Sequence, residues 1–588
     1  MSRLNTFLLF ALVAGCSEHG TTPPPWGVPI TGGTMLVTRD GTHAVVADPD
    51  RDRIVSVELA TGIVKTDLAL TAGDEPGRLI EDGAGRIHVA LRRAGALLTF
   101  SDAASLTQVD RRYACAEPRG LAWDSASNSV YVACTGGELI AFPAGGGVET
   151  RRLFLDRDLR DIIVQGNQLF VTRFKTAQLL TVDLATGAVT TRLTPPDVQR
   201  FDGGFEGPVD GTGMVPAVAS IAWRTIALPD GRMIMSHQRQ VRGKLDTNPG
   251  QQGGYGTGCG EGPVEIATTV VAPGAASATA IHALGRGALP VDIAASATGD
   301  RLALVVAGGH TVKVVDSVAL TTPDQDDCEP PDDDDQGEDD LGAPTSVAFA
   351  PNGDLVIFYP ELPGLVVRAN AGVLARTIEL PGGIGYDAGR AVFHRQTTIG
   401  LACGSCHPEG REDGLVWDFS TLGLRRTQSL AGGILARAPY HWSGDERDLP
   451  TLMDDVFSER MSGGTLTDLQ KASLGPWLDR IAAPAPVVVD PASAERGRAI
   501  FESLDTGCTT CHGGALMTTN TMANVGKGGT FKAPSLLGLA YRAPYMHDGS
   551  VPTLAERFGP LGGGDLHGHT SQLTPEQITD LVAYLESL

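Results

Sequence analysis

Short apolar runs recur in pairs through the first part of the chain, and a few turn-forming residues separate the members of each pair. Four such pairs, which we expect to be strand pairs, occupy residues 44–57, 87–100, 130–142 and 169–182. Equivalent positions in these pairs lie 43, 43 and 39 residues apart, at Ala47, Ala90, Ala133 and Thr172. A further β-like run precedes each pair, so a unit of about 40 residues with four short strands repeats. This period and strand number are typical of the blades of a β-propeller.

The pattern continues less regularly to about residue 380, and seven units can be counted between residues 27 and 383. We therefore expect an all-β propeller with seven blades over residues 27–383. A β-sandwich also contains short strands and turns, but it does not produce a fixed period. The strand pattern and the glycine-rich turns, such as Ala60–Gly62 and Ala185–Gly187, resemble those of the YVTN and lactonase-like propellers.

From about residue 384 the apolar spacing changes, and one pattern then occurs twice. Each copy has a Gly-Arg-Ala-x-Phe segment, an Arg-Ala-Pro-Tyr motif and a Thr that opens a run with apolar residues three or four apart; these begin at Gly389, Arg437 and Thr467 and again at Gly497, Arg542 and Thr574. A Thr at the start of such a run is typical of an N-capped amphipathic helix. The repeat predicts two all-α domains, 384–483 and 494–588, joined by the proline-containing linker 484–493.

The composition favours a turn-rich β architecture over a helical bundle, because the 588 residues include 74 Gly and 37 Pro and only 5% are aromatic. The net charge is −23, and residues 324–340 contain eleven acidic residues and no basic one. This charge argues against a nucleic-acid partner. Clustered carboxylates can bind Ca²⁺, but the spacing is not that of an EF-hand, and a solvated acidic loop is the better interpretation.

The N-terminus has the features of an export signal. Arg3 is followed by the apolar run 7–14, which is too short to span a bilayer, and Leu12–Cys16 resembles a bacterial lipoprotein box. We expect a signal peptide at 1–15, lipidation of Cys16 and a linker at 16–26. An ordinary signal peptide is the alternative. We therefore expect the mature protein to be exported and to face the periplasm. We expect it to be attached to the outer membrane only through its lipid anchor.

The other eight cysteines fall into two groups. Four belong to two Cys-x-x-Cys-His motifs, at 403–407 and 508–512. The remaining four can form disulfides in an oxidising compartment. We expect Cys115 to pair with Cys134, because both flank neighbouring predicted strands, and Cys259 to pair with Cys328, although both lie in irregular segments.

The two Cys-x-x-Cys-His motifs predict two covalently bound haem c groups. Thiols three positions apart can form thioethers with the vinyl groups of one haem, and the adjacent His can then reach the iron. A zinc site or a redox disulfide would not require a His directly after the second Cys both times. The expected attachment residues are Cys403, Cys406 and His407 for one haem and Cys508, Cys511 and His512 for the other.

The final third of the chain resembles the bacterial dihaem cytochrome c peroxidase and MauG family. The likeness rests on Phe531–Gly549 in the second predicted domain and on Arg426–Leu430 and Pro439–Trp442 in the first. It covers about 200 residues and excludes the β region. The resemblance implies that electrons enter at one haem from a redox partner protein, and that hydrogen peroxide or another oxidant reacts at the other.

The chain departs from this family at the axial ligands. The family often has a Met or Tyr ligand about fourteen residues after the equivalent of His547, and here that position is Leu561, which cannot bind iron. In the first domain Met461 lies near the corresponding place and is the candidate distal ligand. The second domain offers four candidate distal ligands: Met546, His547, His567 and Met517.

Three residues near the haem motifs are candidates for catalysis: His441, Trp442 and His547. A His beside an open haem face can deprotonate peroxide, and a Trp between haems can shorten an electron path, although both can also simply pack on the porphyrin.

The sequence supports a dihaem oxidoreductase of peroxidase or MauG type with a propeller for interaction. The alternative is a non-catalytic electron carrier whose propeller binds a partner or ligand. A propeller lactonase ranks last, because no His, Asp and Glu cluster repeats across the blades.

Overall fold

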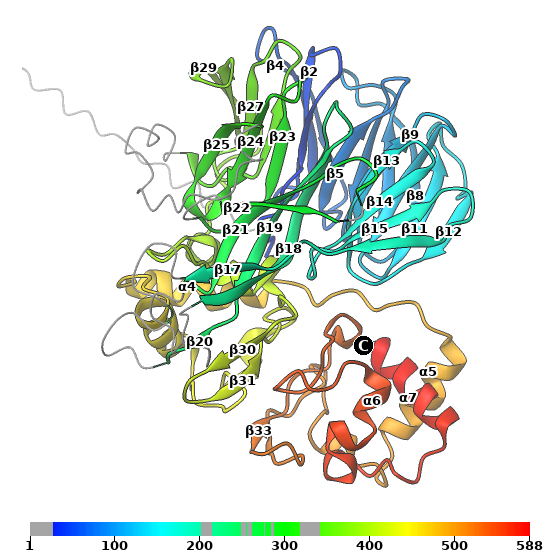
Figure 1. Cartoon of the computed structure of the whole chain (residues 1–588), viewed down its shortest axis with the longest axis vertical. Helices are drawn as coiled ribbons and strands as arrows, with labels where there is room; N and C mark the ends of the chain where they lie inside the picture. The colour runs from blue at the N-terminus through cyan, green and yellow to red at the C-terminus, as the bar shows by residue number, and fades with distance from the viewer. Residues whose placement is uncertain are drawn as a thin grey trace, which may run out of the picture.

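The computed structural model describes residues 27–201, 214–247, 255, 262–275, 277–283, 287–317 and 341–588. The expected signal peptide, Cys16, the linker 16–26, the Cys259–Cys328 pair and the acidic segment 324–340 lie outside the described residues. The chain forms an all-β region followed by a largely helical region (Figure 1). None of the helices within the described ranges is long and apolar enough to cross a membrane.

The β region contains, within the described residues, seven antiparallel sheets that follow one another along the chain. The first four sheets have four strands each: β1 (Met35–Val37), β2 (His43–Asp48), β3 (Arg53–Glu58) and β4 (Ile63–Ala69); β5 (Pro76–Glu81), β6 (Ile87–Leu91), β7 (Ala96–Phe100) and β8 (Gln108–Tyr113); β9 (Pro118–Asp124), β10 (Ser129–Cys134), β11 (Glu138–Pro143) and β12 (Arg151–Phe154); β13 (Leu159–Gln165), β14 (Gln168–Arg173), β15 (Leu179–Asp183) and β16 (Val189–Leu193). The predicted strand pairs are therefore confirmed as the two middle strands of these sheets.

The other three sheets are less regular, as the weaker sequence pattern indicated. They are formed by β17 (Val198–Phe201), β18 (Met214–Ala227), β19 (Met233–Val241), β21 (Val264–Val271) and β22 (Thr279–Ala283); by β23 (Asp292–Ala295), β24 (Arg301–Val306) and β25 (Thr311–Asp316); and by β26 (Ser346–Phe349), β27 (Leu355–Tyr359), β28 (Gly364–Ala369) and β29 (Val373–Glu379). The short strand β20 (Lys244–Leu245) leaves this region and pairs in parallel with β30 (Val416–Phe419) of the helical region.

The sheets close into a ring. One strand of each sheet contacts one strand of the next, in the order β1, β5, β9, β13, β18, β23 and β26. The last of these strands, β26, contacts β1 again, and Figure 1 shows the blue first sheet beside the green last one. We call these seven strands the inner strands.

Separate apolar cores lie between neighbouring sheets. Val45 and Ile54 of the first sheet pack against Ile87 of the second, and the opposite face of the first sheet packs against Phe358 of the last. Because sheets cover each other on both faces, every residue of β6 and β7 is buried. The outer strand β4 instead alternates between exposed and half-buried positions. A disulfide joins Cys115 and Cys134, whose Cα atoms are 6.3 Å apart, and so links the connection between β8 and β9 to the end of β10.

The helical region repeats one arrangement in two segments. The first helical segment (residues 388–482) contains α1 (Ala388–His394), α2 (Cys403–Cys406), β30, β31 (Gly423–Arg426), α3 (Leu449–Leu452), the π-helix η6 (Met453–Arg460) and α4 (Asp468–Asp479). The second helical segment (residues 490–588) contains α5 (Pro491–Phe501), β32 (Met522–Ala523), β33 (Phe531–Lys532), α6 (Leu554–Arg557) and α7 (Pro575–Glu586), with short 3₁₀ turns between them. The small hairpins mean that neither segment is purely α-helical.

In each segment the first and last helices cross at a glycine. A Cβ atom at Gly389 of α1 would overlap the carbonyl oxygen of Ser473 in α4, and one at Gly497 of α5 would overlap that of Asp580 in α7. The backbones can approach this closely only because glycine has no side chain. This contact explains why a glycine opens both copies of the Gly-Arg-Ala-x-Phe segment.

The predicted helix starts at Thr467 and Thr574 are confirmed, since each Thr side chain accepts a hydrogen bond from the backbone N–H three residues on and forms a capping box. Helix α5 begins inside the predicted linker 484–493. The Asp490 side chain accepts hydrogen bonds from the backbone N–H groups of Ala492 and Ser493, and Pro491 occupies the first helical position. The irregular connection is therefore shorter than the proline pattern indicated.

The glycine crossing gives a direct test of the helix packing. A methyl group at position 497 must push α5 away from α7, and overpacking of this kind typically costs about 1–3 kcal/mol. We expect Gly497→Ala to lower the midpoint of thermal unfolding followed by the helical circular dichroism signal. Ala499→Ser, on the exposed side of α5, is the control and should leave the midpoint nearly unchanged. Equal midpoints for the two variants would contradict the close crossing.

Candidate functional site

The first Cys-x-x-Cys-His motif forms the single turn α2 and the residue that follows it. The thiols of Cys403 and Cys406 are unpaired and pack against the apolar cluster around Phe393 and Trp477. Burial raises the pKa of Cys403 to about 12 and raises that of Cys406 well above its ordinary value. One turn of helix therefore presents two protonated thiols side by side in an apolar environment.

The His407 ring is oriented by the backbone of the same loop. Its Nδ1 lies 3.1 Å from the carbonyl oxygen of Arg411, so the N–H at Nδ1 donates and the lone pair remains at Nε2. Burial lowers the pKa of His407, which favours the neutral ring. A neutral imidazole with its Nδ1 held by a carbonyl is the form that binds a metal through Nε2.

A cavity of about 320 Å³ lies beside His407 and is bounded by both helical segments. Its lining includes His407, Trp442 and Met461 from the first segment and Lys532, Tyr545 and Met546 from the second. Most of the exposed lining is apolar, with Phe393, Leu474 and Leu478 contributing. The cavity brings the predicted proximal ligand His407 and the predicted distal ligand Met461 to one space.

Several buried polar atoms around this cavity have no hydrogen-bond partner in the part of the chain that the structure describes. They include Nε2 of Gln428, Oγ of Ser429 and Nε of Arg437. Buried polar groups of a folded protein are ordinarily satisfied, so donors of this kind point to an additional acceptor. The carboxylates of a haem supply such acceptors, and the apolar walls suit the porphyrin ring. The residues present therefore fit a haem.

The second Cys-x-x-Cys-His motif forms the 3₁₀ turn η7 (Cys508–Thr510), which follows Gly507 with a φ of 69°. The thiols of Cys508 and Cys511 are also unpaired. Burial lowers the pKa of His512 to about 4, so this ring is neutral. The ring of His567, from the 3₁₀ turn η10 (Gly564–His567), lies opposite His512 with its centroid 6.3 Å away.

Trp442 and His547, two of the three predicted catalytic residues, meet at the contact between the two helical segments. Their ring centroids are 6.3 Å apart, and the indole N–H of Trp442 donates to the carbonyl oxygen of Arg426 at 2.8 Å. His547 is buried and stacks on Phe531 at 3.7 Å between centroids. These rings form a continuous aromatic contact from one segment to the other.

His441, the third predicted catalytic residue, lines the cavity and has a polar partner that the sequence did not identify. Its Nδ1 lies 3.1 Å from Oδ1 of Asp445, and Ser443 donates to the same oxygen at 2.6 Å. Burial acts to raise the pKa of Asp445, but these hydrogen bonds outweigh it and hold that pKa well below its usual range. Glu446 lies beside the pair, with ligand atoms of all three groups within 4.8 Å.

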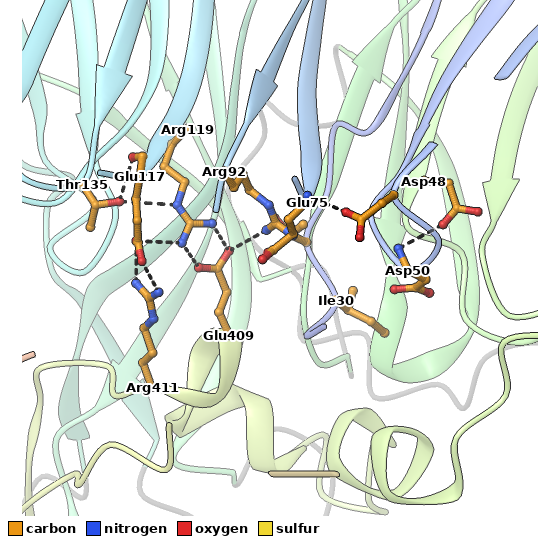
Figure 2. A network of polar contacts seen from close by, with 12 residues as sticks. Ile30, Asp48, Asp50, Glu75, Arg92, Glu117, Arg119, Thr135, Glu409 and Arg411 are labelled. Carbon is orange, nitrogen blue, oxygen red and sulfur yellow. Dashed lines mark hydrogen bonds and ion pairs between the residues drawn. The ribbon is translucent and has the colours of Figure 1, made fainter. Parts of the chain in front are cut away.

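A salt-bridge network joins the first haem motif to the inner strands of the β ring (Figure 2). Glu409, two residues after His407, accepts from Arg119 at 3.0 Å and from Arg160 at 2.8 Å, with Arg92 at 4.0 Å. All four side chains are buried. Burial acts to raise the pKa of Glu409, but the guanidinium charges outweigh it and keep this carboxylate ionised far below its ordinary pKa. We call Glu409, Arg92, Arg119 and Arg160 the Glu409 cluster.

A second ion pair of the network reaches the residue that orients His407. Arg411 donates to Glu117 of the β ring at 2.8 Å (Figure 2). The carbonyl oxygen of Arg411 accepts from His407. Burial acts to raise the pKa of Glu117, but Arg411 outweighs it and lowers the pKa to about 2. Nearby, Lys175 pairs with Glu412 at 2.9 Å. The loop that carries His407 is thus fixed to the ring by buried charges.

The sequence analysis did not identify the Glu409 cluster, although a signal was present. Arg78, Arg119 and Arg160 recur at intervals of 41 residues, the period of the sheets themselves. An arginine repeated with the strand period falls on equivalent inner strands, and in the structure these strands surround the axis of the ring. The acidic partner could not be located in this way, because Glu409 comes from a segment with a different period.

The comparisons agree with this geometry at the C-terminus. Residues 494–588 match the family model for cytochrome c. This segment is therefore a cytochrome c domain, and such a domain carries covalently bound haem c.

A curated relative and two solved structures are similar to parts of the chain. The cytochrome-c peroxidase IdrP1 of Denitromonas iodatirespirans is 43% identical over 67 residues, which are 10% of this chain and only 18% of that protein's length. A hydrazine synthase structure from Kuenenia stuttgartiensis covers 60% of this chain and 99% of its own at 16% identity and a TM-score of 0.44. A streptogramin B lyase structure covers 57% and 91% at 12% identity and a TM-score of 0.33. These structural likenesses are loose, and the fold rests on the sheets described above.

The buried ion pairs predict how stability depends on pH. Because the pKa of Glu117 falls from 4.5 to about 2 on folding, its contribution is complete above about pH 4.5 and is lost as the pH falls toward 2. Removing one charge of a buried pair typically costs about 3–5 kcal/mol. We expect Glu117→Gln to lower the thermal midpoint at pH 7 and to flatten its fall between about pH 5 and pH 3. Glu379→Gln, at an exposed carboxylate, is the control. If the thermal midpoints of the parent and of Glu117→Gln fell in parallel between about pH 5 and pH 3, the lowered pKa of Glu117 in the folded protein would be contradicted.

Proposed function

We propose that the chain is a dihaem c-type cytochrome, with one haem held by Cys403, Cys406 and His407 and a second by Cys508, Cys511 and His512. The observation that carries this proposal is the repetition in both helical segments of two unpaired thiols on one turn with a half-buried neutral imidazole directly after them. The haems would supply iron that takes up and releases single electrons. The chain supplies the apolar walls, the axial nitrogens and the donors that face the haem carboxylates.

The proposal includes a domain assignment. Residues 27–383 form a seven-bladed β-propeller, and 384–483 and 494–588 form two cytochrome c-like domains on either side of the linker. The closed order of inner strands supports the propeller, and the paired glycine crossings support the two domains. Export and lipidation at Cys16 complete the proposal and place both haems outside the cytoplasm, facing the periplasm.

The activity we propose is that of an oxidoreductase of the cytochrome c peroxidase or MauG type. The partial identity with a relative named a cytochrome-c peroxidase supports it. So does the pair His441–Asp445 at the cavity, because Asp445 holds the N–H at Nδ1 and leaves Nε2 free to take a proton from an oxidant such as hydrogen peroxide. Trp442 and His547 bridge the two segments, and a redox partner protein supplies the electrons.

A non-catalytic electron carrier is the second candidate. The observation that favours it is that Leu561, at the position where the family often has its distal ligand, cannot bind iron and is 51% exposed, while the ring of His512 faces His567. In that case the propeller serves to bind a partner or a ligand, and both irons exchange electrons only.

Haem content tests the attachment. We expect Cys406→Ser and Cys511→Ser each to remove about half of the covalent haem absorbance, because each motif holds one of two haems. The measurement is the haem absorbance per chain after denaturation, together with the mass of the intact chain. Cys115→Ser with Cys134→Ser, which removes the disulfide of the β ring, should leave haem content unchanged. A haem content equal to that of the parent in either motif variant would refute the assignment.

Carbon monoxide distinguishes the two candidate functions. Peroxidase-type chemistry requires an iron with a free or exchangeable coordination site, whereas a pure carrier has none. We expect carbon monoxide to shift the absorption spectrum of one of the two reduced haems. A spectrum that does not shift at either haem would contradict the peroxidase-type activity and favour the carrier.

A further inference from the structure

We propose that His567 is the distal ligand of the iron held by His512, so that the second haem has two histidine ligands and no open site. This inference rests on the proposed haem attachment at Cys508 and Cys511. It concerns a residue that lies outside both Cys-x-x-Cys-His motifs, and it assigns the two haems different roles.

The separation of the two rings is the first argument. The centroids of His512 and His567 are 6.3 Å apart, with 40° between the ring planes. A metal–imidazole bond is about 2 Å, and a ring centroid lies about 1.1 Å beyond its nitrogen, so two imidazoles on one metal have centroids about 6 Å apart. A separation of 6.3 Å between the two centroids matches the spacing that two imidazoles on one iron require.

The orientation of His567 is the second argument. Its Nδ1 lies 3.1 Å from the carbonyl oxygen of Gly562, so this N–H donates and the lone pair remains at Nε2. The side chain of Arg557 in turn donates to the carbonyl oxygen of His567 and holds the turn η10 in place. A ligating His characteristically has its other ring nitrogen fixed by a carbonyl, and His407 has the same arrangement with Arg411.

The internal repeat provides a third, independent argument. His567 follows His512 by 55 residues, and Met461 follows His407 by 54. Met461 directly follows η6, and His567 is the last residue of η10; each of these elements is the last short helical turn before the final helix of its segment. The two segments therefore have ligating side chains of different chemistry, a thioether and an imidazole, at corresponding places.

Two of the competing residues of the second segment, Met546 and His547, are placed elsewhere. Met546 lines the cavity beside His407, which lies next to the first motif. His547 stacks on Phe531 and contacts Trp442, so its ring belongs to the contact between segments. Leu561 is half exposed. Among these residues only His567 faces His512 in the described structure.

Two histidine ligands on the second iron would give the two haems different roles in electron transfer. Thioether ligation raises the reduction potential of a haem. A second haem with two histidine ligands would therefore have a lower reduction potential than a first haem with His407 and Met461 as ligands. Electrons would then pass from the second haem to the first, along the contact of His547 with Trp442. The partner protein would reduce the second haem. The oxidant would react at the first haem, beside His441, where Met461 would be the exchangeable ligand.

The test is spectroscopic and uses the full-length mature protein with both haems. In His567→Ala we expect one of the two ferric haems to change from low spin to high spin, and added imidazole to restore low spin by taking the vacated position. In His567→Met we expect a sulfur-to-iron charge-transfer band with twice the parent intensity and a raised potential for the second haem. Electron paramagnetic resonance, near-infrared magnetic circular dichroism and redox titration provide these readouts.

Matched controls isolate the inference. His569→Ala, at an exposed histidine two residues away, and Met546→Leu should both leave the second haem low spin. Haem content is measured in every variant. One haem or none per parent chain would refute the proposed function itself. Two haems per chain with an unchanged low-spin second haem in His567→Ala, or a spin change in Met546→Leu, would overturn the His567 assignment and leave the proposed function intact.

Discussion

The burial of Glu409 among three arginines is the interaction on which the placement of the first Cys-x-x-Cys-His motif, the proposed first haem site, depends. A carboxylate in that position is stable only because guanidinium groups surround it, and those groups, from separate sheets, are kept together only because the sheets form a ring. Glu409 stands two residues after His407, so the pairing fixes the loop of the proximal ligand against the β region. The ring is therefore part of the proposed redox site and not only an appended module.

The β ring also holds the second helical segment in place. Lys175 of the ring contacts both Glu412 and the carbonyl oxygen of Tyr541, and Arg157 pairs with Glu586 at 2.9 Å, so the ring also holds the C-terminal domain. Between the segments, aromatic side chains span the gap and a cavity is shared. This arrangement keeps the two proposed haem sites at a fixed separation, which electron transfer between them would require, and it leaves their axial ligands free to differ.

The sequence predicted the features that depend on local spacing. The 40-residue period located the strands of the first four sheets, and the Cys-x-x-Cys-His motifs located the thiols, because both patterns are set by neighbours along the chain. Partners that come from distant segments were missed: Arg119 meets Glu409 across 290 residues. The sequence analysis also missed the contact of Asp445 with His441 and the start of α5 at Pro491. Both depend on where individual side chains lie, which a repeat in the sequence does not indicate. The choice of His567 among several histidines and methionines likewise required the distance between two rings.

The position of the two irons tests this account most directly. Anomalous scattering at the iron edge from crystals of the mature protein would locate each metal relative to the chain. The account predicts two iron peaks per chain, one within bonding distance of His407 and Met461 and one between His512 and His567. A single peak, or a second peak with no imidazole from His567 beside it, would contradict the arrangement of two differently ligated haems on one β ring.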